Sequence, residues 1–148
     1  MIFATRTRLD GWRAREAIGG DHNARHWLRD HGDMRLNHVA LTVSDRERSA
    51  TFYRDHFGLT ERVHDDEHLL ILGSQEGTLL ALSAGKPGSE VPRTNHFGFQ
   101  LSVGEEVRAA RERFRTAGVR ETEWQDDGNF VRVQVADPDG YRVEMFAF

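Results

Sequence analysis

One strand-like motif occurs twice in the sequence, and this repeat limits the folds that are open to the chain. His38 follows an asparagine at the head of the stretch 36–43, and His96 follows an asparagine at the head of the stretch 95–103. In both copies apolar residues alternate with histidine, small or polar residues, which is typical of a strand packed on one face and open on the other. The repeat therefore predicts two related halves, each beginning with such a strand.

Each copy is followed by the pattern of a helix start, a serine with a glutamate three residues later. Ser44 opens the first pair and Ser102 opens the second. Such pairs are capping boxes, in which the serine oxygen accepts from backbone amides at the helix start and the glutamate reaches back. Gly58 and Gly118 are expected to end the two helices. The expected elements form two β-α-β-β-β halves, with strands at about 35–43, 59–64, 69–72, 78–83, 95–103, 119–125, 130–136 and 141–148, and with helices through Phe57 and over 105–117.

The length of 148 residues fits one domain better than two independent ones. The two halves are therefore expected to be modules of a single domain over 34–148, with module one at 34–84 and module two at 94–148. The segment 85–92 between them is the richest stretch in Gly and Pro, and it is interpreted as a linker.

Residues 1–33 precede the repeat and resemble no part of it. The segment is rich in arginine and contains two tryptophans and three histidines. His22 and His26 have the spacing of metal ligands on one helical face, but a polar surface helix is the simpler interpretation because no third ligand is evident. Met34 stands directly before the first strand, so this N-terminal extension is interpreted as an appended arm or an overlong start assignment.

Composition excludes several classes of protein. A hydrophobic content of 38% with 14 glycines is ordinary for a globular domain. The net charge of −4 gives no attraction to nucleic acid or to an anionic membrane surface, and no apolar run reaches the roughly 20 residues of a bilayer-spanning helix. The chain has no cysteine, which excludes disulfides and thiolate metal sites. We expect a cytoplasmic protein with no nucleic-acid or membrane partner.

A carboxylate completes a possible metal site with the two repeated histidines. The Asp-Pro-Asp-Gly turn at 137–140 leads into the last strand, where every second residue is apolar and Glu144 falls on the opposite, open face. His38 and His96 are expected on the open faces of their own strands. Two neutral imidazoles and one carboxylate suit Fe, Mn, Ni, Co or Zn, and they leave coordination positions free for a substrate.

With these features in these positions, the sequence resembles the vicinal oxygen chelate superfamily, which includes glyoxalases, bleomycin-resistance proteins and extradiol dioxygenases. The resemblance covers roughly residues 35–148. It implies an α+β fold, in which two paired βαβββ modules form a cup-shaped mixed sheet around a metal, here with the N-terminal extension added. It also implies that His38, His96 and Glu144 are the metal ligands and that the chain forms a homodimer, with the cup closed either within one chain or between two.

Departures from the patterns of this superfamily argue against several of its known reactions. Ala81 stands where glyoxalase I and methylmalonyl-CoA epimerase supply a fourth ligand. Gln134 stands where extradiol dioxygenases carry a tyrosine, and no histidine lies between 97 and 148 to act as their acid/base group. Ala40 stands where fosfomycin-modifying members carry a catalytic threonine, and no arginine-bearing segment follows the last strand. No specific reaction or catalytic residue is therefore predicted.

Alternation along the strands also predicts the lining of the cup. Module one would contribute an apolar wall, and module two a cation and an amide, so we expect a small organic substrate with a hydrophobic body and an anionic or carbonyl group. The leading hypothesis is an enzyme that uses its metal as a Lewis acid on such a substrate. The alternatives are a metal-free small-molecule binding protein of the bleomycin-resistance type and a non-catalytic partner module. The expected substrate-binding residues are Arg132, Gln134, Gln100, Phe130, Leu79 and Ile71.

Overall fold

The structure of the protein is a computed structural model that describes residues 36–88 and 94–148. Residues 37–148 form one compact unit. The N-terminal extension with His22 and His26 lies outside the described residues, and so does the part of the predicted linker at 89–93. Among the described residues, no helix is both long and apolar enough to cross a bilayer.

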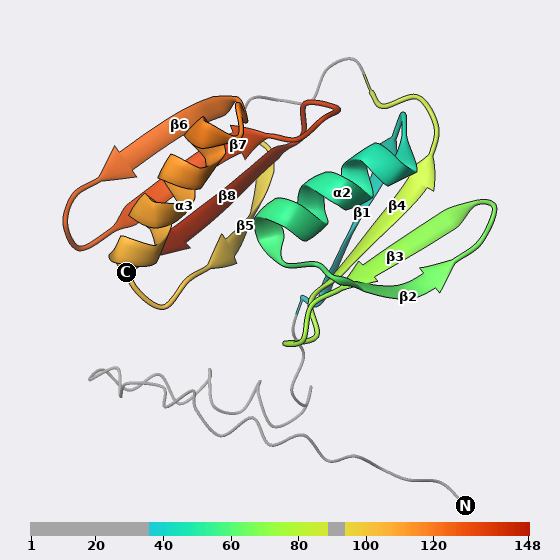
Figure 1. The fold of residues 1–148 in the computed structure, drawn as a ribbon, viewed down its shortest axis with the longest axis horizontal. Coiled ribbons are helices and arrows are strands. Elements are labelled where there is room, and N and C mark those ends of the chain that lie inside the picture. Colours follow the sequence, from blue (N-terminus) through green and yellow to red (C-terminus); the bar gives the residue numbers. More distant parts are fainter. Residues whose placement is uncertain (1–35, 89–93) are drawn as a thin grey trace, which may run out of the picture. The chain divides into compact units, whose positions relative to one another are not determined.

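Module one is a four-stranded mixed sheet with one helix (Figure 1). Strand β1 runs parallel to β4, whereas the β4–β3 and β3–β2 pairs are antiparallel. The strand order is therefore β1-β4-β3-β2. The elements are β1 (His38–Val43), α2 (Arg46–Phe57), β2 (Glu61–Asp65), β3 (Leu69–Gly73) and β4 (Leu79–Ala84).

Module two repeats this arrangement in the order β5-β8-β7-β6, again with one parallel pair, β5–β8 (Figure 1). The predicted fold class, an α+β domain of two βαβββ modules, is confirmed, and each module has its own mixed four-stranded sheet. The elements are β5 (His96–Gln100), α3 (Gly104–Thr116), β6 (Glu121–Asp126), β7 (Val131–Ala136) and β8 (Arg142–Ala147).

The helix ends agree with the sequence at the C-terminus of α2, lie within one residue of it at α3, whose C-cap is Ala117 directly before Gly118, and differ at both N-termini. Gly58 ends α2 with φ of +70°, a left-handed conformation that glycine adopts without steric cost. The prediction that Ser44 caps α2 is wrong, because the side chain of Asp45 accepts from the Arg48 amide at 3.0 Å. The prediction for Ser102 is wrong as well, since the N-cap of α3 is Val103, which makes no side-chain cap hydrogen bond.

Ser44 is unavailable as a cap because it binds the second module. Its hydroxyl donates to Asp139 Oδ1 at 2.5 Å, and its amide donates to the other oxygen of the same carboxylate at 3.1 Å. The neighbouring Asp137 is buried and accepts from the Tyr53 hydroxyl of α2 at 2.8 Å. Burial raises the pKa of both Tyr53 and Asp137, so the tyrosine remains the proton donor of the pair. The turn before β8 therefore fastens module two to module one.

The hydrophobic core lies on one face of each sheet, as the period-two pattern predicted. Buried residues alternate with exposed or half-buried ones along β1, β3 and β4, and the helices cover the buried faces. The opposite faces carry the predicted site residues. The core residues of the sheets include Leu41, Val43, Leu70, Leu72, Leu80, Leu82, Val131, Val133, Val135, Val143, Met145 and Ala147.

Candidate metal centre

The open face of module two collects the polar predicted residues in one row across its strands. Gly98 of β5 pairs with Glu144 of β8, which pairs with Gln134 of β7, which pairs with Glu123 of β6. Residues that are paired across a sheet point to the same face. Strands β8, β7 and β6 thus bring one amide and two carboxylates together, beside Gly98 of β5.

Glu144 is the buried charge in this row, with 8% of its surface exposed. Its Oε2 atom has no hydrogen-bond partner among the described residues. A buried carboxylate oxygen without a partner is costly, and it points to a missing ligand or ion. Gly98 makes room for this side chain, because a Cβ atom at position 98 would lie 2.7 Å from Glu144 Cγ and 3.2 Å from its Oε1.

His96 faces the same carboxylate. Its Nε2 atom lies 3.5 Å from Glu144 Oε2, and its Nδ1 atom lies 2.9 Å from the carbonyl oxygen of Thr94. Because a carbonyl oxygen can only accept, Nδ1 carries a proton, and in the neutral ring the lone pair is then on Nε2, which faces Glu144. This second hydrogen bond fixes the ring in the way that is usual for metal-binding histidines.

Arg132 of β7 lies between two carboxylates on this face. Its Nη2 atom donates to Glu123 Oε2 at 2.7 Å, and its Nη1 atom lies 3.5 Å from Glu144 Oε2. The Nε atom of Arg132 is buried and has no hydrogen-bond partner among the described residues. Gln134 is 1% exposed, and its Oε1 accepts from the Thr122 hydroxyl at 2.9 Å. The predicted cation and amide are thus both beside Glu144.

His38 belongs to module one and does not join the other two predicted ligands. In the part of the chain that the structure describes, no group of three or more His, Asp or Glu side chains is arranged to hold a metal ion. His38 is exposed on β1, and its Nδ1 lies 3.1 Å from Asn37 Oδ1. If Nδ1 of the neutral ring donates to this amide oxygen, the lone pair is on Nε2. Leu79 and Ile71, the predicted apolar wall, share this open face and are half-buried.

The two remaining predicted residues, Gln100 and Phe130, both lie next to Phe146 of β8. Gln100 pairs with Phe146 and follows Gly98 by two positions on the same face of β5. Phe130 packs against Phe146 and Phe148, with ring centroids 6.4 and 5.2 Å apart. Phe130 is therefore part of an aromatic cluster at the C-terminus of the chain.

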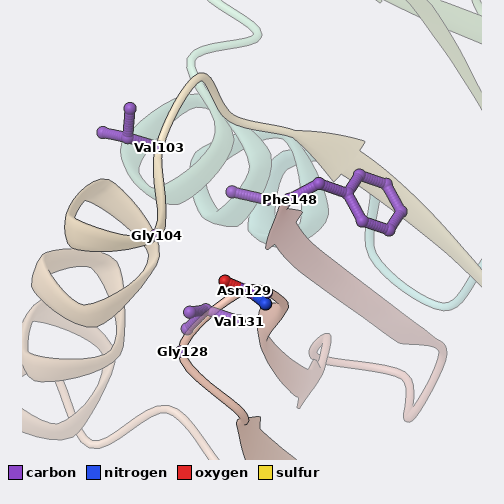
Figure 2. A pocket seen from close by; sticks show the side chains of 7 residues that line it. Val103, Gly104, Gly128, Asn129, Val131 and Phe148 are labelled. Atoms are coloured by element: carbon purple, nitrogen blue, oxygen red, sulfur yellow. The ribbon is translucent and has the colours of Figure 1, made fainter.

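A cavity of about 570 Å³ opens near this cluster, at the start of α3 (Figure 2). Val131 and Ala147 line it, and both belong to the core face of their strands, the face opposite Glu144. Its lining contains no ionisable side chain, whereas the polar predicted residues lie around Glu144 on the opposite face. The complete lining is Val103, Gly104, Gly128, Asn129, Val131, Ala147 and Phe148.

Comparison with known families identifies the superfamily of the chain. The sequence profile of the Glyoxalase/Bleomycin resistance protein/Dioxygenase superfamily matches residues 35–145. The chain belongs to this superfamily. The match covers both modules of the vicinal oxygen chelate fold, and it confirms the family resemblance that was stated from His38, His96 and Glu144.

Two curated members of the superfamily are similar in sequence. The probable trivalent organoarsenical cleaving enzyme of Bacillus subtilis (strain 168) is 30% identical over 119 residues, which cover 76% of this chain and 80% of that protein. The manganese-dependent 2,3-dihydroxybiphenyl 1,2-dioxygenase of Geobacillus genomosp. 3 is 28% identical over 118 residues and 76% of this chain. The alignment spans only 36% of the dioxygenase.

Solved structures of the superfamily share the fold. Lactoylglutathione lyase from Agrobacterium tumefaciens superposes with a TM-score of 0.62 at 25% identity, over 76% of this chain and 92% of that one. The fosfomycin resistance protein FosX from Listeria monocytogenes superposes with a TM-score of 0.67 at 22% identity, over 78% of this chain and 93% of that one, which concerns the fold alone. FosX has also been crystallised with Mn(II). Distant members of the superfamily thus include metal-dependent enzymes.

Glu123 is the charged residue on the open face of module two that sequence reasoning missed. Strand β6 shifts register between Glu121 and Glu123, so that Glu121 pairs with Val135 of the core face and Glu123 with Gln134 of the open face. Strict alternation would have put both glutamates on one face. The sequence contains no signal for this bulge, because its position is set by pairing with β7.

Proposed function

We propose that the protein is a divalent-metal-dependent enzyme that acts as a Lewis acid catalyst on a small organic substrate with chelating oxygen atoms. The proposed ligands are His96, Glu144 and His38. The observation that carries this proposal is the buried Oε2 of Glu144, which lacks a hydrogen-bond partner in the described chain and lies 3.5 Å from His96 Nε2. A cation placed between these two atoms would satisfy both.

The residues around Glu144 fit such an ion. Gly98 leaves space for the carboxylate, and Thr94 holds the His96 ring with its lone pair toward it. A divalent ion held there would polarise a carbonyl or stabilise an oxyanion of the substrate. The Nε atom of Arg132, which has no hydrogen-bond partner in the described chain, could donate to a substrate oxygen. The hydrogen bond from Thr122 holds the Gln134 side chain in place beside Glu144.

We infer that His38 reaches the site from a second copy of the chain in a homodimer. Within one chain His38 does not join His96 and Glu144 in the described structure. The open face of module one carries half-buried apolar side chains, Leu79 and Ile71 among them, which a partner could cover. In a twofold dimer each copy gives what it receives, so two identical sites would form.

The curated relatives bear on the choice of substrate and metal. One of them acts on trivalent organoarsenicals by its name, and soft centres of this kind prefer thiolate ligands. This chain has no cysteine, so we expect an oxygen-bearing substrate instead. The other relative is named as manganese-dependent, which makes Mn(II) the first ion to test.

A metal-free binding protein is the second candidate, and one observation favours it. Arg132 Nη1 lies 3.5 Å from Glu144 Oε2, so a cation of the chain itself already faces the proposed metal ligand. In this alternative Arg132 would neutralise Glu144, and the cup would hold a small molecule without chemistry.

The experiment that tests the proposal is elemental analysis of protein purified without an affinity tag or chelator. We expect close to one divalent metal ion per chain in the wild type and none in His96→Ala, because the variant loses a ligand nitrogen. His68→Ala is the matched control, since His68 is exposed on the β2–β3 hairpin of module one, and it should keep its metal.

The opposite result is equally informative. If the wild type takes up no metal even after incubation with Mn(II), Fe(II), Ni(II), Co(II) and Zn(II), the enzyme proposal is wrong and the binding protein replaces it. If metal is present and survives in His96→Ala, the ligand assignment is wrong.

A further inference from the structure

The bulge in β6 places a second carboxylate within reach of the proposed metal centre. Glu123 turns to the open face at this bulge, while Glu121 turns to α3 and forms an ion pair with Arg111 at 2.7 Å. Glu123 pairs with Gln134, which pairs with Glu144. The register shift in β6 therefore places Glu123 on the same face as Glu144.

Arg132 connects the two carboxylates directly. Its Nη2 contacts Glu123 at 2.7 Å and its Nη1 contacts Glu144 at 3.5 Å. The side chains of Arg132, Glu123 and Glu144 are 25%, 30% and 11% exposed, so solvent screens these charges only in part. The shorter distance means that Glu123 holds the arginine more strongly than Glu144 does.

We propose that Glu123 and Arg132 set the affinity of Glu144 for its divalent cation. This inference rests on the proposed function and concerns residues that are not ligands themselves. Arg132 lowers the negative potential at Glu144 and competes with the metal for Oε2. Glu123 opposes this effect, because it neutralises the guanidinium and draws it away from Glu144. Glu123 is therefore a positioning residue that acts through Arg132.

The charges predict opposite effects for two substitutions. With all three side chains present, the net charge beside the cation is −1. Glu123→Gln changes it to zero and frees Arg132 for Glu144, so the metal should bind more weakly. Arg132→Gln changes it to −2 and removes the competing cation, so the metal should bind more tightly. General destabilisation of the site would weaken binding in both variants.

The test is calorimetric titration of the full chain with Mn(II), alongside thermal unfolding to establish that each variant is folded. We expect the affinity to fall about tenfold in Glu123→Gln and to rise about tenfold in Arg132→Gln, each corresponding to about 1.4 kcal/mol. The double variant has the wild-type net charge and should return near the wild-type affinity. Arg132→Lys keeps the charge and should also remain close to it.

Glu121→Gln is the matched control. It removes a glutamate from the same strand and breaks a comparable ion pair, but that pair faces α3. Its Mn(II) affinity should equal that of the wild type. If Glu123→Gln behaves like Glu121→Gln, or if both charge variants bind more weakly, this inference is wrong while the metal site stands. A wild type that binds no Mn(II) or other divalent ion would instead overturn the proposed function.

Discussion

The two modules share one backbone plan, but the row of side chains across the middle of the open face differs between them. In module one the row across the open face is Ala40, Ala81, Ile71 and His64. In module two the corresponding row is Gly98, Glu144, Gln134 and Glu123. Both second strands even contain a register shift at the same place, between Arg62 and His64 and between Glu121 and Glu123.

This difference assigns separate roles to the modules. The row in module one is mostly apolar and contains a single possible metal ligand, His64. Strand β1 of this module also carries His38. The row in module two is polar, with Gln134 and Glu144 buried, and Gly98 leaves the space that the Glu144 side chain occupies. A repeated module can thus keep its core face and its hairpin bulge while its open face carries either apolar or charged side chains.

The largest expected effect is on metal uptake, and it distinguishes a metal site formed within one chain from a site formed between two chains. His38→Ala and His96→Ala should each abolish metal uptake as pure proteins. After the two variants are mixed under conditions that exchange subunits, metal should return to about a quarter of the sites, because half of the dimers are hybrids with one complete site each. Elemental analysis of the mixture measures this recovery.

A mixture of His96→Ala with Glu144→Ala provides the control for subunit exchange. Both lesions fall in module two, so every hybrid site lacks one ligand and no metal should return. If the mixture of His38→Ala with His96→Ala also recovers nothing, although exchange is demonstrated, the dimeric site is refuted.

A smaller effect is expected from exchanging glycine and alanine between the modules. Gly98→Ala places a Cβ atom 2.7 Å from Glu144 Cγ, so the carboxylate must move. We expect Mn(II) affinity to fall at least about tenfold and the free energy of unfolding to fall by about 1–3 kcal/mol. Urea denaturation and calorimetry measure the two quantities.

Ala40→Gly is the corresponding change in module one, where the paired residue is Ala81 and carries no carboxylate. This substitution should lower the free energy of unfolding by only about 0.5–1 kcal/mol, as is usual for glycine in a strand, and leave the Mn(II) affinity unchanged. Equal losses of affinity in both variants would show that the modules do not differ at this position.

The smallest expected effect is on stability at low pH, through an ion pair that links the helix of module two to its sheet. In module two, Arg108 of α3 contacts both oxygens of Asp126 on β6, at 2.7 and 2.8 Å. The guanidinium, with the Gly128 amide, lowers the pKa of Asp126 to about 2. An unfolded aspartate titrates near 3.9, so the contribution of this pair is complete above that pH and is lost as the pH falls toward 2.

Asp126→Asn should therefore remove part of the decline in unfolding free energy between about pH 4 and pH 2, measured by urea denaturation across that range. Asp127→Asn is the control, because Asp127 accepts from Gln125 and not from Arg108. If both variants keep the wild-type pH profile, the ion pair contributes nothing to the tie between α3 and β6.

The fold, and the sheet face on which each candidate residue lies, could be predicted from the sequence, because period-two alternation determines faces without knowledge of partners. Alternation placed Glu144 and Arg132 on the open face of their strands and Val143 and Met145 in the core, and the structure agrees. The glycine at position 58 ended α2 for a reason that is local to the backbone.

Properties that depend on pairing were decided only by the tertiary structure. Ser44 is no helix cap because Asp139, distant in sequence, binds it. His56 lies in the last turn of α2, and its ring packs against Phe52 and against Phe114 of the other module. Glu123 reaches the open face only through a bulge that its pairing with β7 creates.

The sequence by itself thus determined which residues could be ligands, because strand alternation and residue chemistry are local. The tertiary structure decided which of them meet within one chain, bringing His96 to Glu144 and leaving His38 apart. The physical reason is that a side chain's face follows from its own strand, whereas its neighbours follow from the register and packing of strands far away in the sequence.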